Sequence, residues 1–232
     1  MAFDFKKEYK EFYMPGNQPE IVTVPKANYI AVRGKGDPNE KDGTYQKAIG
    51  VLYAVAYTIK MSYKTDYRIQ GFYEYVVPPL EGFWWQPGVE GIDFLDKSTF
   101  NWISVIRLPD FVTEEDFKWA VQTAEKKKKL DCSRAEFLTI DEGECVQIMH
   151  IGAFDEEPET VAKMDAYLEE QGYENDFCGG RLHHEIYLSD ARRVDPKKWK
   201  TVIRHPVKKK ASCGFCQMPK EDIHMKAQKH RW

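Results

Sequence analysis

The segment LHHEIYL at 182–188 carries the side chains best suited to chemistry. Its composition predicts a strand, in which successive side chains point to opposite faces. His183, Glu185 and Tyr187 then share one face, while the aliphatic Ile186 lies on the other. If the first face is the wall of a cleft, Glu185 is partly desolvated, and its pKa rises toward the range useful for a general base. The alternative is an exposed face with polar side chains.

Aromatic residues are concentrated upstream of this segment and could line the same cleft. Trp84 and Trp85 are neighbours, so in a strand they point opposite ways, and at most one can be wholly in the core. Aromatic residues in a small domain are more often core than ligand contacts, and this alternative stays open. A hollow lined by Trp and Tyr and floored by a glutamate would bind planar, hydrophobic or cationic molecules. The candidate ligand contacts are Trp84, Trp85, Trp102, His183, Tyr75 and Phe83.

A third group of candidate residues lies near the C-terminus: Cys213, Cys216, His224 and His230. Cysteine and histidine are the usual ligands of tetrahedral structural zinc. The stretch between Cys216 and His224 is shorter than in zinc fingers, so the segment would have to fold as a tight zinc knuckle. The alternative is a tail in which these residues are incidental. No other cofactor is required, because the sequence has no P-loop, GxGxxG, HExxH or GxSxG motif.

The composition is that of a folded protein of 232 residues, enough for one large domain or two small ones. Hydrophobic residues make up 42% and aromatic residues 14%, which excludes intrinsic disorder. No apolar run is long enough to cross a bilayer, and the N-terminus lacks the apolar core of a signal peptide, so we expect a cytoplasmic protein without membrane association. The odd count of five cysteines argues against a disulfide framework. The net charge of −3 argues against a nucleic-acid partner.

Hydrophobic periodicity predicts the elements that must position these residues. Strand patterns cover 20–34, 71–77, 80–86, 99–108, 144–151 and 182–188, and helical patterns cover 45–60, 113–129 and 159–171. Thr113 and Asp116 form a capping signature before the second helix. The lysines at 126–129 suit the macrodipole at its end. The segment 196–203 fits either a short helix or a strand.

The two halves of the chain follow one plan. Each consists of a strand, a loop with Gly, Asp and Pro, a helix and further strands, and Gly36 and Gly152 stand at corresponding places. This order predicts an α+β fold: a tandem pseudo-twofold repeat of two strand-helix-strand-strand modules with a central ligand groove. The expected parts are an N-terminal extension at 1–19, a ligand-binding domain at 20–207 with halves of about 20–130 and 131–207, and a Cys/His-containing tail at 208–232.

Several motifs together resemble one known family. They are PLEGFWW at 79–85, MHIG at 149–152 with DEEPET at 155–160, HHEIYLSDARR at 183–193 and RHPV at 204–207. In this order they resemble the GyrI-like small-molecule-binding domain proteins, and most of all the stand-alone branch. The resemblance covers about residues 20–207 and says nothing of the tail. Ala191 departs from the pattern, since relatives often have Pro after Ser-Asp.

The resemblance implies both a fold and a function. The family fold is a tandem of two strand-helix-strand-strand modules with the ligand in the central groove. In multidrug-responsive members, a buried glutamate on a late strand meets cationic aromatic drugs, and Glu185 fits that position. Stand-alone members resemble enzymes that hydrolyse cyclopropanoid genotoxins of the duocarmycin and yatakemycin type. Detoxification, and with it resistance, is therefore the implied role.

The reaction implied by the resemblance is the opening of a cyclopropane ring. Glu185 would accept a proton from the attacking water. Tyr73 or Tyr187 would donate a hydrogen bond or a proton to the carbonyl oxygen of the substrate, where negative charge develops. The residues expected to stack on the flat ligand are Trp84, Trp85 and Trp102.

Three functions remain open on the sequence alone. The first is a hydrolase that detoxifies reactive hydrophobic small molecules. The second is a non-catalytic module that sequesters or senses amphipathic cations. The third is an interaction protein whose C-terminal zinc knuckle docks a partner. A self-contained transcription regulator is disfavoured, because the sequence shows no N-terminal helix-turn-helix segment and no basic recognition helix.

Overall fold

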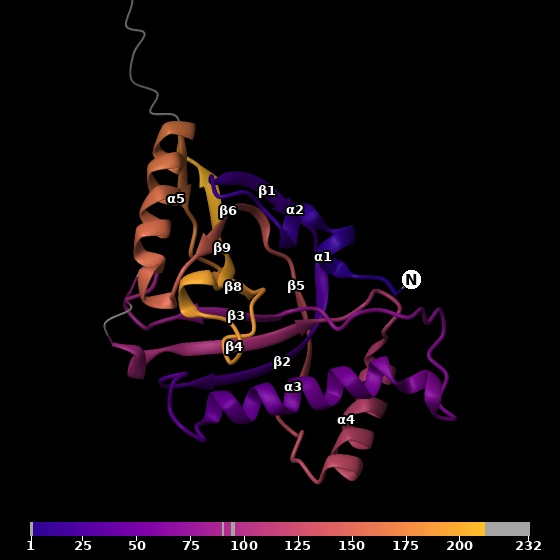
Figure 1. The fold of residues 1–232 in the computed structure, drawn as a ribbon. Coiled ribbons are helices and arrows are strands. Elements are labelled where there is room, and N and C mark those ends of the chain that lie inside the picture. Colours follow the sequence, from indigo (N-terminus) through magenta and orange to yellow (C-terminus); the bar gives the residue numbers. More distant parts are fainter. Residues whose placement is uncertain (1, 90, 94–95, 212–232) are drawn as a thin grey trace, which may run out of the picture.

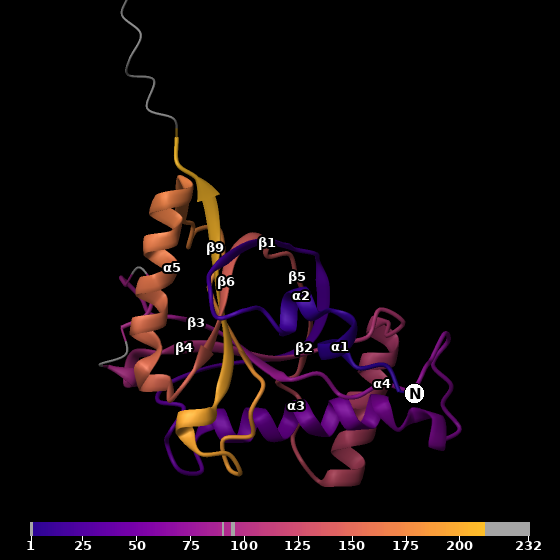
Figure 2. The same cartoon turned by 45° about the horizontal axis from the view of Figure 1, so that its top comes forward.

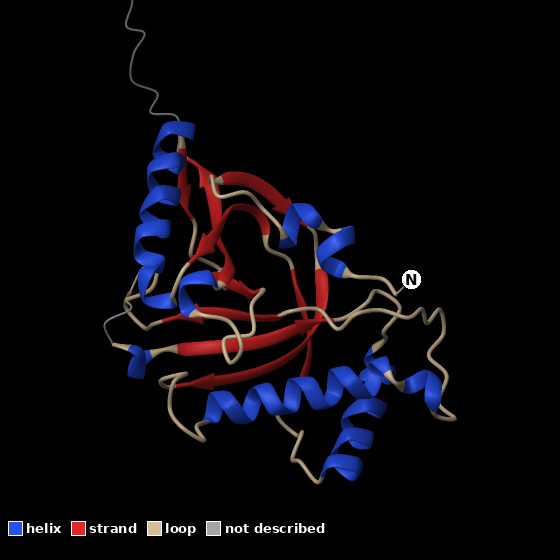
Figure 3. Cartoon of the chain, in the orientation of Figure 1, coloured by secondary structure: helices blue, strands red, loops and turns tan. Residues whose placement is uncertain are grey.

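The computed structural model describes residues 2–89, 91–93 and 96–211. Its centre is an antiparallel sheet with the strand order β1-β6-β9-β8-β3-β4-β2-β5 (Figures 1 and 3). The strands are β1 (Glu20–Val24), β2 (Ala27–Lys35), β3 (Leu80–Trp85), β4 (Asn101–Arg107), β5 (Glu136–Ile140), β6 (Gly143–Ile151), β7 (Tyr173–Asn175), β8 (His183–Tyr187) and β9 (Lys200–Lys209). The short β7 pairs with β9 beside this path. The fold is thus mixed, with helices around one large antiparallel sheet.

The sheet is curled, because very short connections join its two ends. β1 and β2 are six strand spacings apart along the sheet, which would be about 29 Å if it were flat. Only Pro25 and Lys26 separate these strands, and a link of that length spans about 11 Å at most. Asp141 and Glu142 connect β5 to β6 across the same number of strands. The sheet therefore has an outer and an inner face, and Figure 1 shows β6 and β9 running across the direction of β2, β3 and β4.

Two long helices cover the outer face. α3 (Thr44–Lys60) packs on β2 and β4, and α5 (Glu157–Gln171) packs on β6 (Figure 2). Each helix has buried residues at helical spacing, so one stripe of it faces the sheet. These residues include Ala48, Leu52, Val55 and Ile59 in α3 and Thr160, Met164 and Leu168 in α5. Within the described residues, every helix is too short or too polar to span a bilayer.

The N-terminal segment covers part of the inner face. It forms two short helices, α1 (Phe5–Glu8) and α2 (Lys10–Tyr13). The buried residues of this inner cluster are Phe5, Tyr13, Tyr75, Met149, Ile186 and Val202. Ile186 and Val202 are paired on β8 and β9, so the N-terminal helices pack directly on the middle of the sheet.

The predicted second helix is confirmed in detail. α4 (Glu114–Lys128) packs beside α3 and begins with the predicted capping box, in which Thr113 and Asp116 bond each other's backbone N–H groups. Its last turn contains three lysines, and Lys129 adopts a left-handed conformation that ends the helix. The acidic Asp116 in the first turn and the lysines in the last turn both suit the charges at the ends of a helix.

Other predicted elements differ from the structure for local reasons. The strand predicted at 71–77 is wrong: in the described residues this segment pairs only through an isolated bridge between Phe3 and Tyr75. Pro78 and Pro79 follow it, and they have no N–H group for a sheet ladder. The strand predicted at 20–34 is divided by Pro25 into β1 and β2. The ambiguous segment at 196–203 contains a single 3-10 turn and then the start of β9.

Gly34 on β2 leaves room for the ring of Trp102, its partner on β4, to lie over the backbone of residue 34. The two residues pair in register, and a Cβ on Gly34 would lie 2.1 Å from Cζ2 of Trp102. Trp102 is fully buried, so its ring cannot move aside without disturbing the core. We expect Gly34→Ala to destabilise the protein by about 1–3 kcal/mol in denaturant unfolding. Gly50→Ala in α3 is the matched control: nothing lies within 4 Å of its new methyl group, so it should not destabilise.

Candidate functional site

The sheet register brings residues of three strands together on the outer face. Trp102 pairs with Trp84, and Trp84 pairs with His183, so these side chains form a row across β4, β3 and β8. Glu185 and Tyr187 follow at alternate positions of β8 and continue the same surface. The predicted alternation of β8 is therefore present in the structure.

Gly82 makes room at the centre of this surface. It lies opposite Glu185, and a Cβ on it would be 2.6 Å from Nε1 of Trp84 and 2.9 Å from the hydroxyl of Tyr187. Because residue 82 has no side chain, Trp84 Nε1 donates a hydrogen bond to the Tyr187 hydroxyl at 2.9 Å. The indole and the phenol are thus fixed side by side next to Glu185.

His183 links Glu185 to a second histidine. Its Nε2 lies 2.9 Å from Oε1 of Glu185, and its Nδ1 lies 2.7 Å from Nε2 of His205 on β9. Burial, together with the neighbouring His183, lowers the pKa of His205 well below its usual value. In the tautomer of neutral His205 that carries its proton on Nε2, this nitrogen donates to Nδ1 of His183, and His183 Nε2 donates in turn to Glu185. This relay fixes the orientation of Glu185.

A second carboxyl group, that of Glu157, meets Glu185 from the first turn of α5. Glu157 is fully buried, and apart from the carboxyl group of Glu185 neither of its oxygens has a hydrogen-bond partner among the described residues. Burial raises the pKa of Glu157 well above its usual value, and the adjacent Glu185 raises it further. Two such buried carboxyl groups share a proton, because their charges would repel each other. Since Glu185 already accepts from His183, the geometry places the shared proton on Glu157.

Phenol groups and aromatic rings border the carboxyl pair. Burial raises the pKa of Tyr187 well above its usual value, with a further contribution from Glu185, and burial likewise raises that of Tyr45 in α3. Both phenols therefore stay protonated and can donate hydrogen bonds. The Tyr45 ring lies 5.4 Å from that of Trp84, and the Phe154 ring lies 5.8 Å from that of Tyr187. The arrangement thus offers a base, an acid and a phenol donor within an aromatic border.

Replacing Glu157 should change how stability depends on pH. A carboxyl group whose pKa is raised by folding stabilises the protein fully below its unfolded pKa, and this contribution is lost as the pH rises through the folded pKa. In that interval the wild type should lose up to about 1.4 kcal/mol per pH unit through this group. Glu157→Gln has no such titration, so we expect it to gain stability relative to the wild type between pH 5 and pH 8.

Urea unfolding at several pH values measures this difference. Glu159→Gln, an exposed substitution in the same helix, is the control and should run parallel to the wild type. Parallel profiles for the wild type and Glu157→Gln would show that Glu157 is ionised in the folded protein, contrary to the shared-proton arrangement.

The same residues could also hold a metal ion. Glu157, His183 and Glu185 each offer one ligand atom, and these atoms lie within 4.8 Å of one another. With a metal ion on Nε2 of His183, its Nδ1 would donate to Nε2 of His205, the usual arrangement of an outer partner of a metal-ligating histidine. The predicted zinc ligands lie outside the described residues, and that site stays a prediction: Cys213, Cys216, His224 and His230.

The structure brings some of the predicted site residues together and separates others. On the outer face it groups Glu185, Tyr187, His183, Trp84 and Trp102. Phe83 and Trp85 alternate with Trp84, so they lie on the inner face. Tyr73 contacts Phe3 and Phe111 away from this group, and Tyr75 is buried in the N-terminal cluster. Tyr187 is therefore the phenol beside Glu185.

Four residues of the site are not among those that the sequence singles out as candidate site residues: Glu157, Tyr45, Phe154 and His205. Glu157 had an available signal, because it lies on the same helical stripe as Thr160, Met164 and Leu168. An acidic residue in the first turn of a helix is usually explained by the macrodipole, and this explanation hides the signal. Phe154 lies in a short 3-10 turn, for which the sequence offers no periodicity.

A separate buried network lies on the inner face, directly behind the site. His184 Nδ1 is 2.9 Å from Oε1 of Glu142, and its Nε2 is 3.0 Å from Oε2 of Glu81. Arg204 donates from Nη1 to Oε2 of Glu142 at 2.9 Å, and the Tyr13 hydroxyl donates to Glu81 at 3.0 Å. Burial opposes ionisation of Glu142, but the charges of His184 and Arg204 outweigh it and lower its pKa to about 2. This network ties α2 and the turn between β5 and β6 to the middle of the sheet.

Comparisons with known proteins match the chain to one family. The family model of the GyrI-like small molecule binding domain matches residues 17–208. The crystal structure of a hydrolase from Listeria innocua is 50% identical, with a TM-score of 0.83, and the match covers 90% of this chain and 100% of that chain. An uncharacterized conserved protein from the same organism is also 50% identical, with a TM-score of 0.83 and coverage of 89% and 100%.

A more distant structure shares the fold. The C-terminal domain of EcmrR is 13% identical, with a TM-score of 0.54, and the match covers 83% of this chain and 98% of that chain. At this identity the likeness concerns the fold alone. A search of curated proteins found no match.

Proposed function

Since the chain belongs to the family of GyrI-like small-molecule-binding domains, we propose that its outer face binds a flat, hydrophobic small molecule and hydrolyses it. A hydrolase from Listeria innocua is 50% identical over 90% of the chain, which supports a hydrolytic reaction. The proposed substrates are cyclopropanoid genotoxins, in which a cyclopropane ring is conjugated to a dienone. The expected biological consequence is detoxification.

The observation that carries this proposal is the buried pair of Glu157 and Glu185. Glu157 is fully buried and Glu185 is 8% exposed, so bulk water does not screen the interaction between the two carboxyl groups. A carboxylate beside a carboxylic acid supplies a general base and a general acid within one site. The His183 relay fixes the orientation of the base before substrate arrives.

The proposed reaction adds one water molecule to the substrate. Glu185 takes a proton from water while the water oxygen bonds to the cyclopropane methylene carbon. The C–C bond of the strained ring breaks, and its electron pair moves through the dienone to the carbonyl oxygen, which becomes a phenolate. Glu157 protonates this oxygen, and the proton on Glu185 then passes to Glu157, which restores the starting pair. Tyr187 donates a hydrogen bond to the oxygen while its charge develops.

The aromatic border supports binding of a flat substrate. Trp84 is held in place by its hydrogen bond to Tyr187 and is 5% exposed, so its ring is a fixed, buried part of the aromatic border. Tyr45 in α3 approaches the same ring from the helix side. Tyr187 and Glu157 therefore meet the carbonyl end of the substrate, and Glu185 lies toward its methylene carbon.

A pseudo-twofold relation between the two halves would put this site at their junction. The series β2-α3-β3-β4 and β6-α5-β8-β9 repeat the same order of elements, with the short β7 as an addition in the second. β3 and β8 are neighbours in the middle of the strand order, and each belongs to one series. Superposing residues 27–107 on residues 143–209 tests this relation.

Turnover in isotopically labelled water tests the proposed function. The purified protein is incubated with a duocarmycin-type cyclopropanoid in water enriched in oxygen-18, and the products are followed by mass spectrometry. We expect a product heavier by one labelled water, with the label on the opened methylene carbon. Tight binding without any such product would overturn the hydrolase and leave a binding module.

One observation favours a non-catalytic second candidate. Glu185 lies opposite Gly82, beside the bonded pair of Trp84 and Tyr187, and such a site would also hold an amphipathic aromatic cation. The protein would then sequester or sense its ligand. In that case removing the charge of Glu185 should abolish binding of the cation, whereas the hydrolase retains affinity for its neutral substrate.

A further inference from the structure

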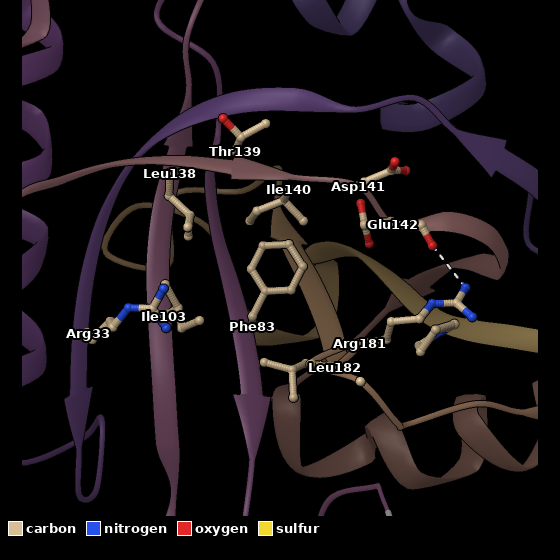
Figure 4. A pocket seen from close by; sticks show the side chains of 13 residues that line it. Arg33, Phe83, Ile103, Leu138, Thr139, Ile140, Asp141, Glu142, Arg181 and Leu182 are labelled. Atoms are coloured by element: carbon tan, nitrogen blue, oxygen red, sulfur yellow. Dashed lines mark hydrogen bonds between the residues drawn. The ribbon is translucent and has the colours of Figure 1, made fainter. Parts of the chain in front are cut away.

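The inner face of the curled sheet holds a cavity of about 370 Å³, away from the carboxyl pair. Phe83 and Ile103 are paired neighbours on its floor, and Leu138 and Ile140 of β5 lie across from them (Figure 4). Phe83 alternates with Gly82, whose partner Glu185 faces outward, so the sheet itself separates this cavity from the outer site. Its volume is within the range of small-molecule sites, which is about 300–1,000 Å³.

The centre of the cavity is lined by apolar side chains. Besides the floor, Leu182 contributes its side chain from the segment before β8 (Figure 4). The Phe83 ring is held in a fixed position because it stacks on His184 with ring centres 3.9 Å apart. A fixed phenyl ring with aliphatic side chains around it fits a flat apolar body.

The cavity is electrostatically asymmetric. At one end, Arg33 extends toward the Phe83 side of the cavity (Figure 4), and only its Nε is bonded, to Glu136 at 3.0 Å. The two terminal nitrogens of Arg33 have no partner among the described residues, and Arg134 donates to the Arg33 carbonyl group, so this end has a net positive charge. At the other end Asp141 is exposed, while the Arg181 guanidinium is already bonded to Asp176.

From this arrangement we propose that the inner cavity is a second binding site, and that it takes a small flat aromatic carboxylate. The apolar body stacks on Phe83 between the aliphatic walls. The carboxylate accepts two hydrogen bonds from the terminal nitrogens of Arg33, the geometry in which a guanidinium binds carboxylates best. Asp141 repels a carboxylate, so the ligand enters with its charged end at Arg33.

Binding of 2-naphthoate, measured by isothermal titration, tests the proposal. Saturable binding with one site is expected, and Arg33→Met should weaken it by about tenfold or more, since hydrogen bonds between charged groups are lost. The neutral analogue 2-naphthamide should bind the wild type and Arg33→Met within about twofold of each other, because it makes no ion pair. Leu138→Trp, which introduces a large ring at a half-buried position that faces the cavity, should weaken both ligands.

Two controls distinguish this site from the outer one. Arg192→Met removes an exposed arginine that pairs with Asp190 and should leave 2-naphthoate binding unchanged. Glu185→Gln should also leave it unchanged, so failure of the proposed hydrolase does not affect this test. Absence of saturable binding would overturn the proposal. So would binding that responds to Glu185→Gln but not to Arg33→Met, because the probe would then occupy the outer face.

Discussion

Glu185→Gln is expected to lower the turnover of a cyclopropanoid substrate by about 10²- to 10⁴-fold. The amide has nearly the same shape as the carboxylate. Its oxygen can still accept the hydrogen bond from His183 Nε2, which lies 2.9 Å from the carboxylate in the wild type. What it cannot do is accept a proton from the attacking water. Affinity for the neutral substrate should therefore change by less than about threefold, since the lost interaction forms only in the transition state.

Steady-state kinetics and direct binding together measure this effect. Glu156→Gln is the matched control, because Glu156 is exposed, adjacent to Glu157, and bonded only to the backbone N–H of Ala153 in the described residues. It should retain wild-type turnover. Normal turnover by Glu185→Gln would remove Glu185 from the reaction. A large loss of affinity for cations without any turnover in the wild type would favour the binding module.

Glu142→Gln is expected to destabilise the protein by about 3–5 kcal/mol, the usual cost of breaking a buried ion pair by removing one partner. Arg204 is 2% exposed and His184 is fully buried, so neither can recover hydration when the carboxylate is lost. Arg204 would keep Gln147 and the carbonyl group of Phe12 as partners, but both are neutral. The change leaves a buried guanidinium with less compensation than before.

The effect should depend on pH in a defined direction. The folded pKa of Glu142 is lowered from 4.5 to about 2, so its stabilising contribution is present above pH 4.5 and is lost as the pH falls toward 2. The wild type should therefore lose more stability than Glu142→Gln over that interval, and the two unfolding curves should converge in acid. Chemical denaturation at pH 7, 4 and 3 measures this convergence.

The control for this experiment is the same substitution in an exposed ion pair. Glu114 and Lys118 are bonded at 2.8 Å, and both side chains are 63% exposed. Glu114→Gln should cost less than about 1 kcal/mol, because solvent screens such pairs. If the two substitutions cost the same, the inner network contributes no more than a surface pair does.

Strand alternation made the central part of the site predictable. The pattern of β8 assigns Glu185 and Tyr187 to one face from the sequence alone, and adjacent tryptophans require that Trp84 and Trp85 diverge. Trp84 is indeed buried and Trp85 only partly so. These inferences succeed because a period of two is a local property of the backbone.

Properties that depend on distant pairing were not predictable in the same way. The position of Glu157 beside Glu185 depends on how α5 docks on the sheet, and no periodicity within either element encodes that contact. The segment at 71–77 has the composition of a strand, but among the described residues it pairs only with Phe3, outside the sheet. The inner cavity depends on curling of the sheet, which becomes evident only when the two-residue connections are placed on the strand order.

Both faces of β8 carry required side chains, and this restricts where the chain can accept insertions or deletions. His183 and Glu185 serve the outer face, while His184, between them, completes the ion-pair network inside. Displacing this strand by one residue along β3 and β9 would exchange the two faces. A shift in one direction puts His184 where the base belongs, and a shift in the other puts Ile186 there and the Glu185 carboxylate where His184 was. Insertions or deletions in the segment between β7 and β8 are therefore acceptable only if the loop absorbs them without moving the strand. Homologues should vary in that loop's length while keeping the pairing of Gly82 with Glu185.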